Sequence, residues 1–210
     1  MTDTFVDTPA EPGGRLQLLA AILLGLAATM TALSAYQAAL LDGEALQGYS
    51  VSNSQLSDAN YFYNQGNQTL ASDQQLFVQY ATATQQEDAD LSEYLKTLMR
   101  PELSEAIDWW TSSEEAVTPF DEDAANPYVV NDFAEAEALD KKSKATFKEA
   151  SAADDQGDQF ELAAVLFALT LFFGGIATLF ARRSVSLGLL GIATLALVTG
   201  AVQLAMAFAA

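Results

Sequence analysis

The apolar residues of this chain gather in three long runs, and the rest of the sequence is polar. The runs cover residues 16–41, 160–181 and 184–210. A helix rises about 1.5 Å per residue, so about 20 apolar residues cross the hydrocarbon core of a bilayer. Each run therefore predicts one transmembrane helix. Only Arg182 and Arg183 separate the last two runs, so these helices are expected to form a tight transmembrane hairpin.

The three runs divide the chain into segments. We expect a flexible tail over 1–15, transmembrane helices over 16–41, 159–181 and 184–208, and a helical extramembrane domain over 42–158. The expected fold class is all-α, with three transmembrane helices and an elongated helical hairpin or bundle as a stalk.

The first run has a second interpretation, which is a secretory signal peptide. Arg15 precedes its Leu- and Ala-rich core, and residues 32–34 resemble a cleavage site. The run is longer than a usual signal core, and it continues without a break into helix-compatible sequence. These two features favour an uncleaved transmembrane helix.

In the polar segment a seven-residue repeat begins at Leu56. One set of positions is Leu56, Tyr63, Leu70, Phe77, Thr84, Leu91 and Leu98, and the intervening set is Ala59, Gly66, Asp73, Tyr80, Glu87 and Tyr94. This spacing predicts one long helix over 42–99 with a coiled-coil type seam, and Gly66 is its weakest point, the place where a bend is easiest. The seam fits either packing against the same chain or an intermolecular coiled coil. Its polar interruptions and aromatic residues favour the first.

The second half of the polar segment supplies the return path toward the second span. Pro101 suits the first turn of a helix, which is predicted over 101–117. A loop is predicted over 118–128, and a further helix over 129–158 that runs into the second span. Four lysines in that helix are expected to face the acidic residues 87–93 across an antiparallel helix pair. They are Lys141, Lys142, Lys144 and Lys148.

The polar segment is strongly acidic. Residues 42–158 hold 24 of the 28 acidic residues and six of the nine basic ones, and the whole chain has a net charge of −19. Such a domain repels phosphates, so nucleic acid is not expected as a partner. The chain has no Cys and no His, which excludes disulfides, thiolate or imidazole metal sites and the common nucleophile–base pairs. We therefore expect no catalytic residue, no cofactor and no metal, and we expect that the protein is not an enzyme.

The arginines predict an orientation in the plasma membrane. Arg15, Arg182 and Arg183 flank the spans, and positive residues next to spans favour the cytoplasmic side. This places the N-terminus in the cytoplasm, and the helical domain and the C-terminus outside. The lysines over 141–148 lie near the second span and count against this orientation. However, their segment is longer than the roughly 60 residues over which the rule works well, and acidic residues surround them.

Four glycines in the last two spans are candidates for close helix packing. They are Gly174, Gly175, Gly188 and Gly191, and small residues let helix backbones approach closely in a membrane. The simplest interpretation is that they pack the hairpin itself.

Three further residues are candidates for interaction. Trp109 and Trp110 are either an anchor for a partner or a cap on the core at the tip of the domain, and the second interpretation is favoured. Glu161 lies at the start of the second span, where a carboxylate at a helix end reaches water, so a structural role is favoured over a functional one. The acidic clusters at 121–123 and 154–158 lack the spacing of an EF-hand and are interpreted as solvated charge.

Several short segments resemble a group of uncharacterised prokaryotic membrane proteins. The segments are Gly157-Asp158-Gln159-Phe160-Glu161-Leu162, Val165-Leu166-Phe167-Ala168 and Leu171-Phe172-Phe173-Gly174-Gly175-Ile176, with a looser likeness at Tyr61-Phe62-Tyr63-Asn64-Gln65. Proteins of this group have one N-terminal span, a helical middle and a C-terminal transmembrane hairpin. The resemblance implies the same three-span architecture. Because the function of the group is unknown, it implies no catalytic residue.

These observations lead to hypotheses from different classes. The first is a structural or interaction protein that contacts membrane lipid and associates with itself, as a homo-oligomer, or with another membrane protein. The alternative is a subunit of a homo-oligomeric channel or transport complex, which requires polar residues such as Thr170, Thr178 or Gln203 to line a pathway. A third is a cation sensor that uses the acidic domain.

Overall fold

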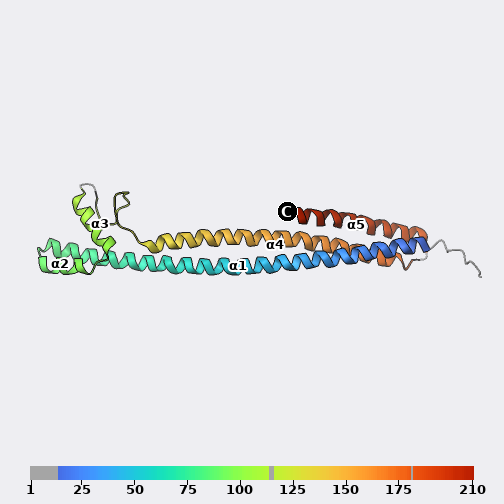
Figure 1. Ribbon diagram of the computed structural model, residues 1–210, viewed down its shortest axis with the longest axis horizontal. Coiled ribbons are helices and arrows are strands. Elements are labelled where there is room, and N and C mark those ends of the chain that lie inside the picture. Colours follow the sequence, from blue (N-terminus) through green and yellow to red (C-terminus); the bar gives the residue numbers. More distant parts are fainter. Residues whose placement is uncertain (1–13, 114–115, 181) are drawn as a thin grey trace, which may run out of the picture. The chain divides into compact units, whose positions relative to one another are not determined.

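The computed structural model describes residues 14–113, 116–180 and 182–210, and the described chain is all-α, as predicted (Figure 1). The expected tail lies outside these residues except for Gly14 and Arg15, which begin the first helix. The described chain contains five helices: α1 (Gly14–Gln85), α2 (Ala89–Thr97), α3 (Pro101–Ser112), α4 (Asn131–Ala177) and α5 (Arg183–Ala209).

Three of these helices are long and apolar enough to cross a membrane. They are α1, α4 and α5, and their most apolar windows have a mean hydropathy of 2.1. The first predicted span forms part of α1, the second ends α4, and the third is α5. The helix of the second span ends at Ala177, earlier than the predicted end at residue 181, and the chain then turns before Arg183. The prediction of three membrane-spanning helices is thus confirmed by length and composition.

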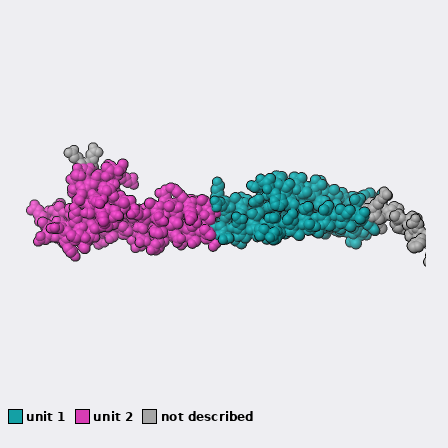
Figure 2. All heavy atoms as spheres, in the orientation of Figure 1, with its two compact units in different colours: residues 1–49, 147–210 teal, residues 50–146 magenta. Residues whose placement is uncertain are grey.

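The helices contribute to two compact units, which Figure 2 distinguishes by colour. Unit 1 combines the described residues up to Tyr49 with Phe147–Ala210, and unit 2 is Ser50–Thr146. Unit 1 therefore holds the apolar parts of α1 and α4 together with all of α5. Unit 2 holds the polar end of α1, the start of α4, and α2 and α3.

Within each unit, α1 and α4 pack antiparallel along a seam of small residues. In unit 1 a Cβ on Gly48 would lie 2.7 Å from the Cβ of Ala150, and in unit 2 Ser52 contacts Ser143. On both helices the buried small residues recur every seven positions. The series are Ala45, Ser52, Ala59 and Gly66 on α1, and Ala136, Ser143, Ala150 and Gly157 on α4. Small side chains at this spacing let the two helix axes approach closely over several turns.

The seven-residue repeat predicted in the polar segment exists, and α1 packs there against the same chain. Ala59, Gly66 and Asp73 of the intervening set are buried in the seam. Leu56 and Tyr63, which belong to the other set, stay 42% and 56% exposed beside it. The helix continues through Gly66 without interruption, because that glycine accommodates the ring of Phe133 from α4. Gly66 therefore does not interrupt the helix.

The long helix does not reach Met99, as the repeat had suggested. It ends at Gln85, and Glu87 adopts a left-handed conformation with φ of 58°. Asp88 then caps α2, since its Oδ1 accepts a hydrogen bond from the backbone N–H of Leu91 at 3.1 Å. A side chain that satisfies a free N–H at a helix start stabilises a new helix there. The prediction of one helix over 42–99 is corrected to two helices with a turn between them.

A small apolar core closes the end of unit 2 that holds α3. Met99, Leu103 and Ile107 are buried there, and α3 begins at Pro101 as predicted. Aromatic rings from α1 and from the irregular segment after α3 surround these residues. They are Phe77, Tyr80, Phe120 and Tyr128. The helix predicted over 101–117 ends at Ser112, and the loop predicted over 118–128 is irregular as expected.

Candidate interaction surfaces

The outer surface of unit 1 is apolar, and its interior combines small residues with three large buried side chains, Phe160, Phe167 and Leu204. On α5 the buried positions Ser186, Ala193, Gly200 and Ala207 again recur every seven residues. Large side chains point outward instead, among them Leu195 at 67% and Phe172 at 59% exposure. This inside-out distribution is typical of helices in lipid, where apolar surface needs no burial in protein.

The apolar stretches of α1, α4 and α5 end at one level in unit 1. A Cβ on Gly157 of α4 would lie 2.9 Å from Oδ1 of Asp42, the first charged residue after the apolar run of α1. Beside it, the side-chain amide of Gln156 donates a hydrogen bond of 2.9 Å to the carbonyl of Ala207, near the end of α5. The change from apolar to polar residues on α1 and α4 at one level, beside the last turn of α5, matches the boundary of a bilayer.

The four glycines singled out in the sequence differ in what surrounds them. A Cβ on Gly174 would lie 3.0 Å from Leu24, so this glycine packs against α1. Apart from the neighbouring residues and the backbone of the same helix, no described atom lies within 4 Å of a Cβ placed on Gly175, Gly188 or Gly191. The close approach between α4 and α5 lies at Gly200, where a Cβ would meet the ring of Phe167 at 2.9 Å. Sequence reasoning missed Gly200, although its place in the seven-residue series of α5 marks it.

The predicted orientation determinants lie at the ends of the apolar helices. Arg182 is the N-cap of α5 and Arg183 is its first residue, and both are exposed. Arg15 falls in the first turn of α1, and its side chain lies outside the described residues. Glu161 is exposed on α4, one turn from the level of Gly157.

The threonines of the spans bond within their own helices. The hydroxyl of Thr170 donates to Leu166 O at 3.1 Å, and that of Thr178 donates to Gly175 O at 2.7 Å. Thr170 is fully buried, whereas Thr178 is exposed. Hydroxyl groups bonded in this way need no partner from another helix. Gln203 is half-buried on α5.

A polar network fastens the chain before α3 to α1 in unit 2. Asp73 of α1 is buried, and its Oδ2 accepts a hydrogen bond of 2.5 Å from Nε of Arg100 and one of 2.9 Å from the hydroxyl of Tyr128. Nη2 of Arg100 also donates to the carbonyl of Val129 at 2.7 Å, and the guanidinium lies 5.1 Å from the centre of the Tyr128 ring. A buried carboxylate with a paired cation and a second donor is well satisfied, so the network holds three distant segments together.

The network raises the pKa of two of its residues, Tyr128 and Arg100. Burial raises the pKa of Tyr128, and together with the hydrogen bond to the carboxylate of Asp73 it outweighs the opposing effect of Arg100, so the pKa is about 12. For Arg100, burial acts against the charge, but the hydrogen bonds with Asp73 and Tyr128 outweigh it and raise the pKa. The network therefore keeps the guanidinium charged and the phenol protonated at neutral pH.

The two tryptophans lie at the end of unit 2, and both are half-buried. The ring of Trp110 meets that of Phe77 edge-on, with 5.3 Å between the ring centres. Trp110 therefore packs at the edge of the apolar core, in agreement with the interpretation that one tryptophan caps it. Trp109 remains a candidate for contact with a partner.

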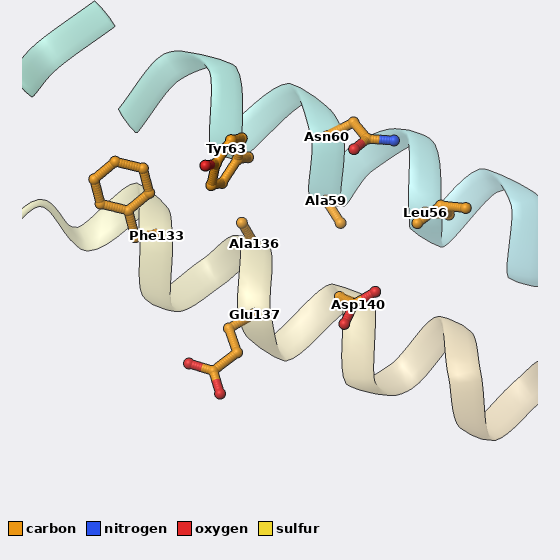
Figure 3. Close-up of a pocket in the computed structure, with 8 residues that line it drawn as sticks. All are labelled: Leu56, Ala59, Asn60, Tyr63, Phe133, Ala136, Glu137 and Asp140. Carbon is orange, nitrogen blue, oxygen red and sulfur yellow. The ribbon is translucent and has the colours of Figure 1, made fainter. Parts of the chain in front are cut away.

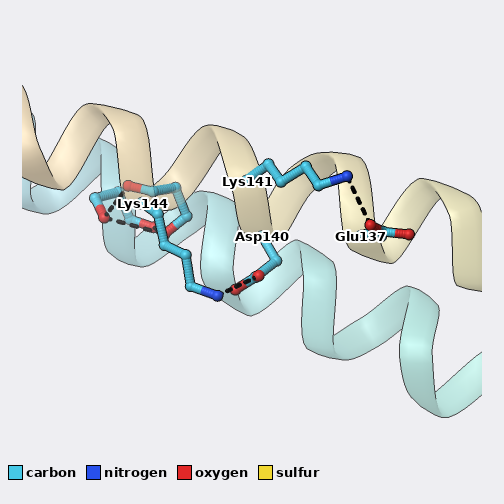
Figure 4. Close-up of polar contacts among 6 residues, drawn as sticks. Glu137, Asp140, Lys141 and Lys144 are labelled. Atoms are coloured by element: carbon cyan, nitrogen blue, oxygen red, sulfur yellow. Dashed lines mark hydrogen bonds and ion pairs between the residues drawn. The ribbon is translucent and has the colours of Figure 1, made fainter.

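The lysines of α4 do not face residues 87–93, so that prediction was wrong. Lys141 pairs with Glu137, and Lys144 pairs with Asp140, each at 2.6 Å and one helical turn away (Figure 4). The buried hydroxyl of Ser52 donates a hydrogen bond to the carbonyl of Ser143, and the hydroxyl of Ser143 donates one to the carbonyl of Ser52, each at 2.9 Å. These two bonds link α1 to α4. The seam, rather than attraction between the helices, sets the register, because surface ion pairs stabilise by little.

A groove of about 540 Å³ lies between α1 and α4 in unit 2 (Figure 3). Small residues of the seam, Ala59 and Ala136, lie at its base. Larger side chains stand around them, namely Leu56, Asn60, Tyr63, Phe133, Glu137 and Asp140. The rings of Tyr63 and Phe133 are in contact, with 5.6 Å between their centres. The groove is thus largely apolar, with an uncharged edge on α1 and an edge on α4 whose carboxylates are paired with lysines.

Neither acidic cluster forms a metal site within the described residues. In the first, Asp121 instead accepts hydrogen bonds from the hydroxyl of Thr118 and from the backbone N–H groups of Val117 and Thr118. These bonds hold the pKa of Asp121 below its usual value. In the second, Oδ2 of Asp154 lies 3.4 Å from the hydroxyl of Tyr49.

No known protein-family model, curated protein or solved structure matches this chain.

Proposed function

We propose that the protein is a non-enzymatic integral membrane protein that presents an acidic helical domain outside the plasma membrane for protein–protein contacts or assembly. Three apolar helices would anchor it, and the helical domain would act through its surface rather than through catalysis. This architecture is the one implied by the resemblance to uncharacterised three-span prokaryotic membrane proteins.

The observation that carries the proposal is the contrast between the surfaces of the two units. The outward side chains of unit 1 are large and apolar, as at Leu195, which suits lipid. Unit 2 is acidic, with 18 acidic and five basic residues, yet it exposes large apolar side chains such as Leu56 and Tyr63. These two side chains line a groove together with Ala59, Phe133 and Ala136, and an apolar groove on an otherwise charged domain is typical of a protein contact.

The orientation rests on the arginines. Arg182 and Arg183 lie together at the start of α5, and the positive-inside tendency favours the cytoplasm for this end of the helix. The helical domain is connected through α1 and α4 to the opposite ends of the spans, so it would lie outside.

Cysteine labelling tests the orientation, because the chain has no cysteine of its own. Ala124→Cys lies in the exposed loop of unit 2, and Ser184→Cys lies beside Arg183. In right-side-out vesicles, a membrane-impermeant maleimide should label the first variant at once and the second only after permeabilisation. The reverse pattern would place the helical domain in the cytoplasm and overturn the orientation.

Native mass spectrometry of the protein in nanodiscs tests the role in assembly. A closed oligomer, or the chain in a fixed ratio with another membrane protein, is the expected result. A bare monomer under all extraction conditions would contradict the proposal. A ring of copies whose polar span residues face inward would favour a channel or transport complex instead.

A further inference from the structure

Two adjacent rows of residues on α1 in unit 2 carry no charge. The rows consist of Leu56, Tyr63 and Leu70, and of Asn53, Asn60, Asn67 and Gln74, and together we name them the neutral strip. Each row repeats every seven residues, so it follows one side of the helix. The Asn and Gln residues are exposed, and Leu56 and Tyr63 are about half exposed. The strip borders the groove, whose lining includes Leu56, Asn60 and Tyr63.

Charged residues are few on the part of α1 that belongs to unit 2. In the part of α1 that belongs to unit 2, the charged residues are Asp58 and Asp73. Asp73 is buried and paired with Arg100. Asp58 is two residues from both Leu56 and Asn60, which places it on the far side of the helix at 3.6 residues per turn. The remaining 16 acidic residues of unit 2, and all five basic ones, follow α1 in the sequence.

The opposite edge of the groove, on α4, carries charges that offset one another. Glu137 and Asp140 line the groove, and each forms an ion pair at 2.6 Å with Lys141 or Lys144. An approaching acidic protein therefore meets a neutral helix face on α1 and a balanced edge on α4.

We infer that a second copy of this chain covers the neutral strip, with α1 packed in parallel against α1 of that copy. The inference deepens the proposed function by naming the partner, and it rests on that function. Leu56 and Tyr63 of each copy would pack at the edge of the other copy's groove. The α1–α4 pair of each copy would then form half of a four-helix assembly, in which the large apolar side chains are covered.

Charge argues for a copy rather than a different partner. A chain with a net charge of −19 repels its own copy over most of its surface, whereas the neutral strip combines the absence of charge with exposed large apolar side chains beside the groove. A basic partner would gain more from the acidic residues that follow α1. Depletion of charge with retention of aromatic residues is also the composition of an interface core.

The membrane and the asparagines argue for the parallel arrangement. Two copies inserted with the same topology have α1 running in the same direction, because α1 also contains the first span. In a parallel pair in register, each row lies against the same row of the other copy. An Asn side chain both donates and accepts hydrogen bonds, so Asn60 and Asn67 can pair with their own copies, and a buried Asn at such a position specifies register.

Single-cysteine variants of the full chain, assayed in membranes under mild oxidation, test the inference. Asn67→Cys places a thiol in the neutral strip. Ser72→Cys is the matched control, since it replaces another exposed polar residue five positions on, about 140° around the same helix. Asn67→Cys should give at least about tenfold more disulfide-linked dimer than Ser72→Cys, because a disulfide needs Cβ atoms within about 4.5 Å. Equal crosslinking of both variants, or crosslinking of neither, would overturn the inference.

Charge substitutions provide a second test that does not depend on crosslinking. Tyr63→Glu adds a carboxylate to the strip, whereas Tyr61→Glu adds one to a side that faces away, and the two tyrosines are 56% and 63% exposed. In nanodiscs, Tyr63→Glu should convert the dimer to monomer, and Tyr61→Glu should leave it intact. Circular dichroism should show unchanged helix content for both. A dimer that survives Tyr63→Glu in a folded protein would contradict the inference.

The outcomes also separate this inference from the proposed function. If neither cysteine crosslinks but the chain copurifies in a fixed ratio with another membrane protein, the second copy is ruled out and the role in assembly stands. If the chain is a bare monomer in every preparation, both are overturned.

Discussion

In unit 1, α1 and α4 turn small residues such as Ala27 and Ala163 inward and large apolar residues such as Leu26 and Val165 outward. In unit 2, the same two helices keep an inward seam of small residues, but their outward rows contain Asn, Gln and charged residues beside a few large apolar ones. A seam of Ala, Ser and Gly buries little apolar area, so it fixes geometry more than it supplies hydrophobic stabilisation.

The two units share the seam between α1 and α4 and differ in their outward residues. We infer that these outward residues suit lipid in unit 1 and a protein or water surface in unit 2. Lipid covers the outward apolar residues in the proposed arrangement of unit 1. In the same proposed arrangement water surrounds unit 2, and we assign a second copy of the chain to the surface around Leu56 and Tyr63. The polar network of Asp73, Arg100 and Tyr128 contributes stability to unit 2 that its thin seam does not.

The largest expected difference between the units appears when an arginine is placed on the outward face of each. Leu195→Arg in unit 1 should oppose membrane insertion by about 3 kcal/mol, because a central arginine faces lipid. Val78→Arg in unit 2 is the matched control, since the two side chains are 67% and 62% exposed, and its effect should stay within about 0.5 kcal/mol. The amount of protein that resists alkaline extraction from membranes measures the difference. Equal tolerance would show that Leu195 does not face lipid.

Removal of the buried cation in unit 2 should have the next largest effect. Arg100→Ala leaves the carboxylate of Asp73 buried without its ion pair, which should cost about 2–3 kcal/mol of unfolding free energy. Lys96→Ala is the control, because Lys96 pairs with Asp108 at the exposed surface and should contribute less than about 1 kcal/mol. Denaturant unfolding followed by circular dichroism would measure both. A loss for Lys96→Ala as large as that for Arg100→Ala would contradict the structural role of the network.

Two glycines of α1 test the seam itself. Gly48→Ala would place a methyl group 2.7 Å from the Cβ of Ala150, so it should destabilise unit 1 by about 1–2 kcal/mol. Gly43→Ala meets no described atom within 4 Å and should stabilise the helix by about 0.5–1 kcal/mol. Opposite shifts of the melting temperature are expected. Shifts of the same sign would mean that the helices are not closely packed at Gly48.

The smallest expected effect is a loss of stability at high pH in unit 2. The pKa of Tyr128 is about 12 in the folded chain and about 10 in the unfolded chain, so the fold favours the protonated phenol. This contribution is complete below about pH 10 and is lost as the pH rises through about 12. Unfolding measured across this range should show the loss, and Tyr128→Phe should remove it. An unchanged pH profile in Tyr128→Phe would exclude Tyr128 as the cause.

The membrane-spanning helices were predictable because long uninterrupted apolar runs have no competing interpretation apart from a signal peptide. Pro101 and the loop that follows α3 were predictable for a similar reason, since proline and clustered polar residues act locally. The break after Gln85 was missed because no Gly or Pro marks it. Its signal is the capping residue Asp88, with Asp90 in the first turn of α2.

The seam and the network were harder to find from the sequence. Small residues every seven positions stand out poorly in an Ala-rich chain, so Gly200 was overlooked in favour of Gly188 and Gly191. The partners Asp73, Arg100 and Tyr128 are far apart in the sequence, and only the folded chain brings them together. The lysines were assigned to the distant acidic residues 87–93, although the four-residue spacing of Glu137 and Lys141, and of Asp140 and Lys144, already indicates pairing within one helical turn.

A scan of accessibility along α1 tests most directly the claim that lipid covers unit 1 and protein covers the neutral strip of unit 2. Spin labels on single-cysteine variants of the full chain in liposomes would be exposed to oxygen, which enters lipid, and to a water-soluble nickel complex. Labels at outward positions such as Leu26 should respond to oxygen alone, and those at Ser72 should respond strongly to nickel. Labels at Asn67 should respond weakly to both. A nickel response at Asn67 equal to that at Ser72 would show that water, and not a second copy, covers the strip.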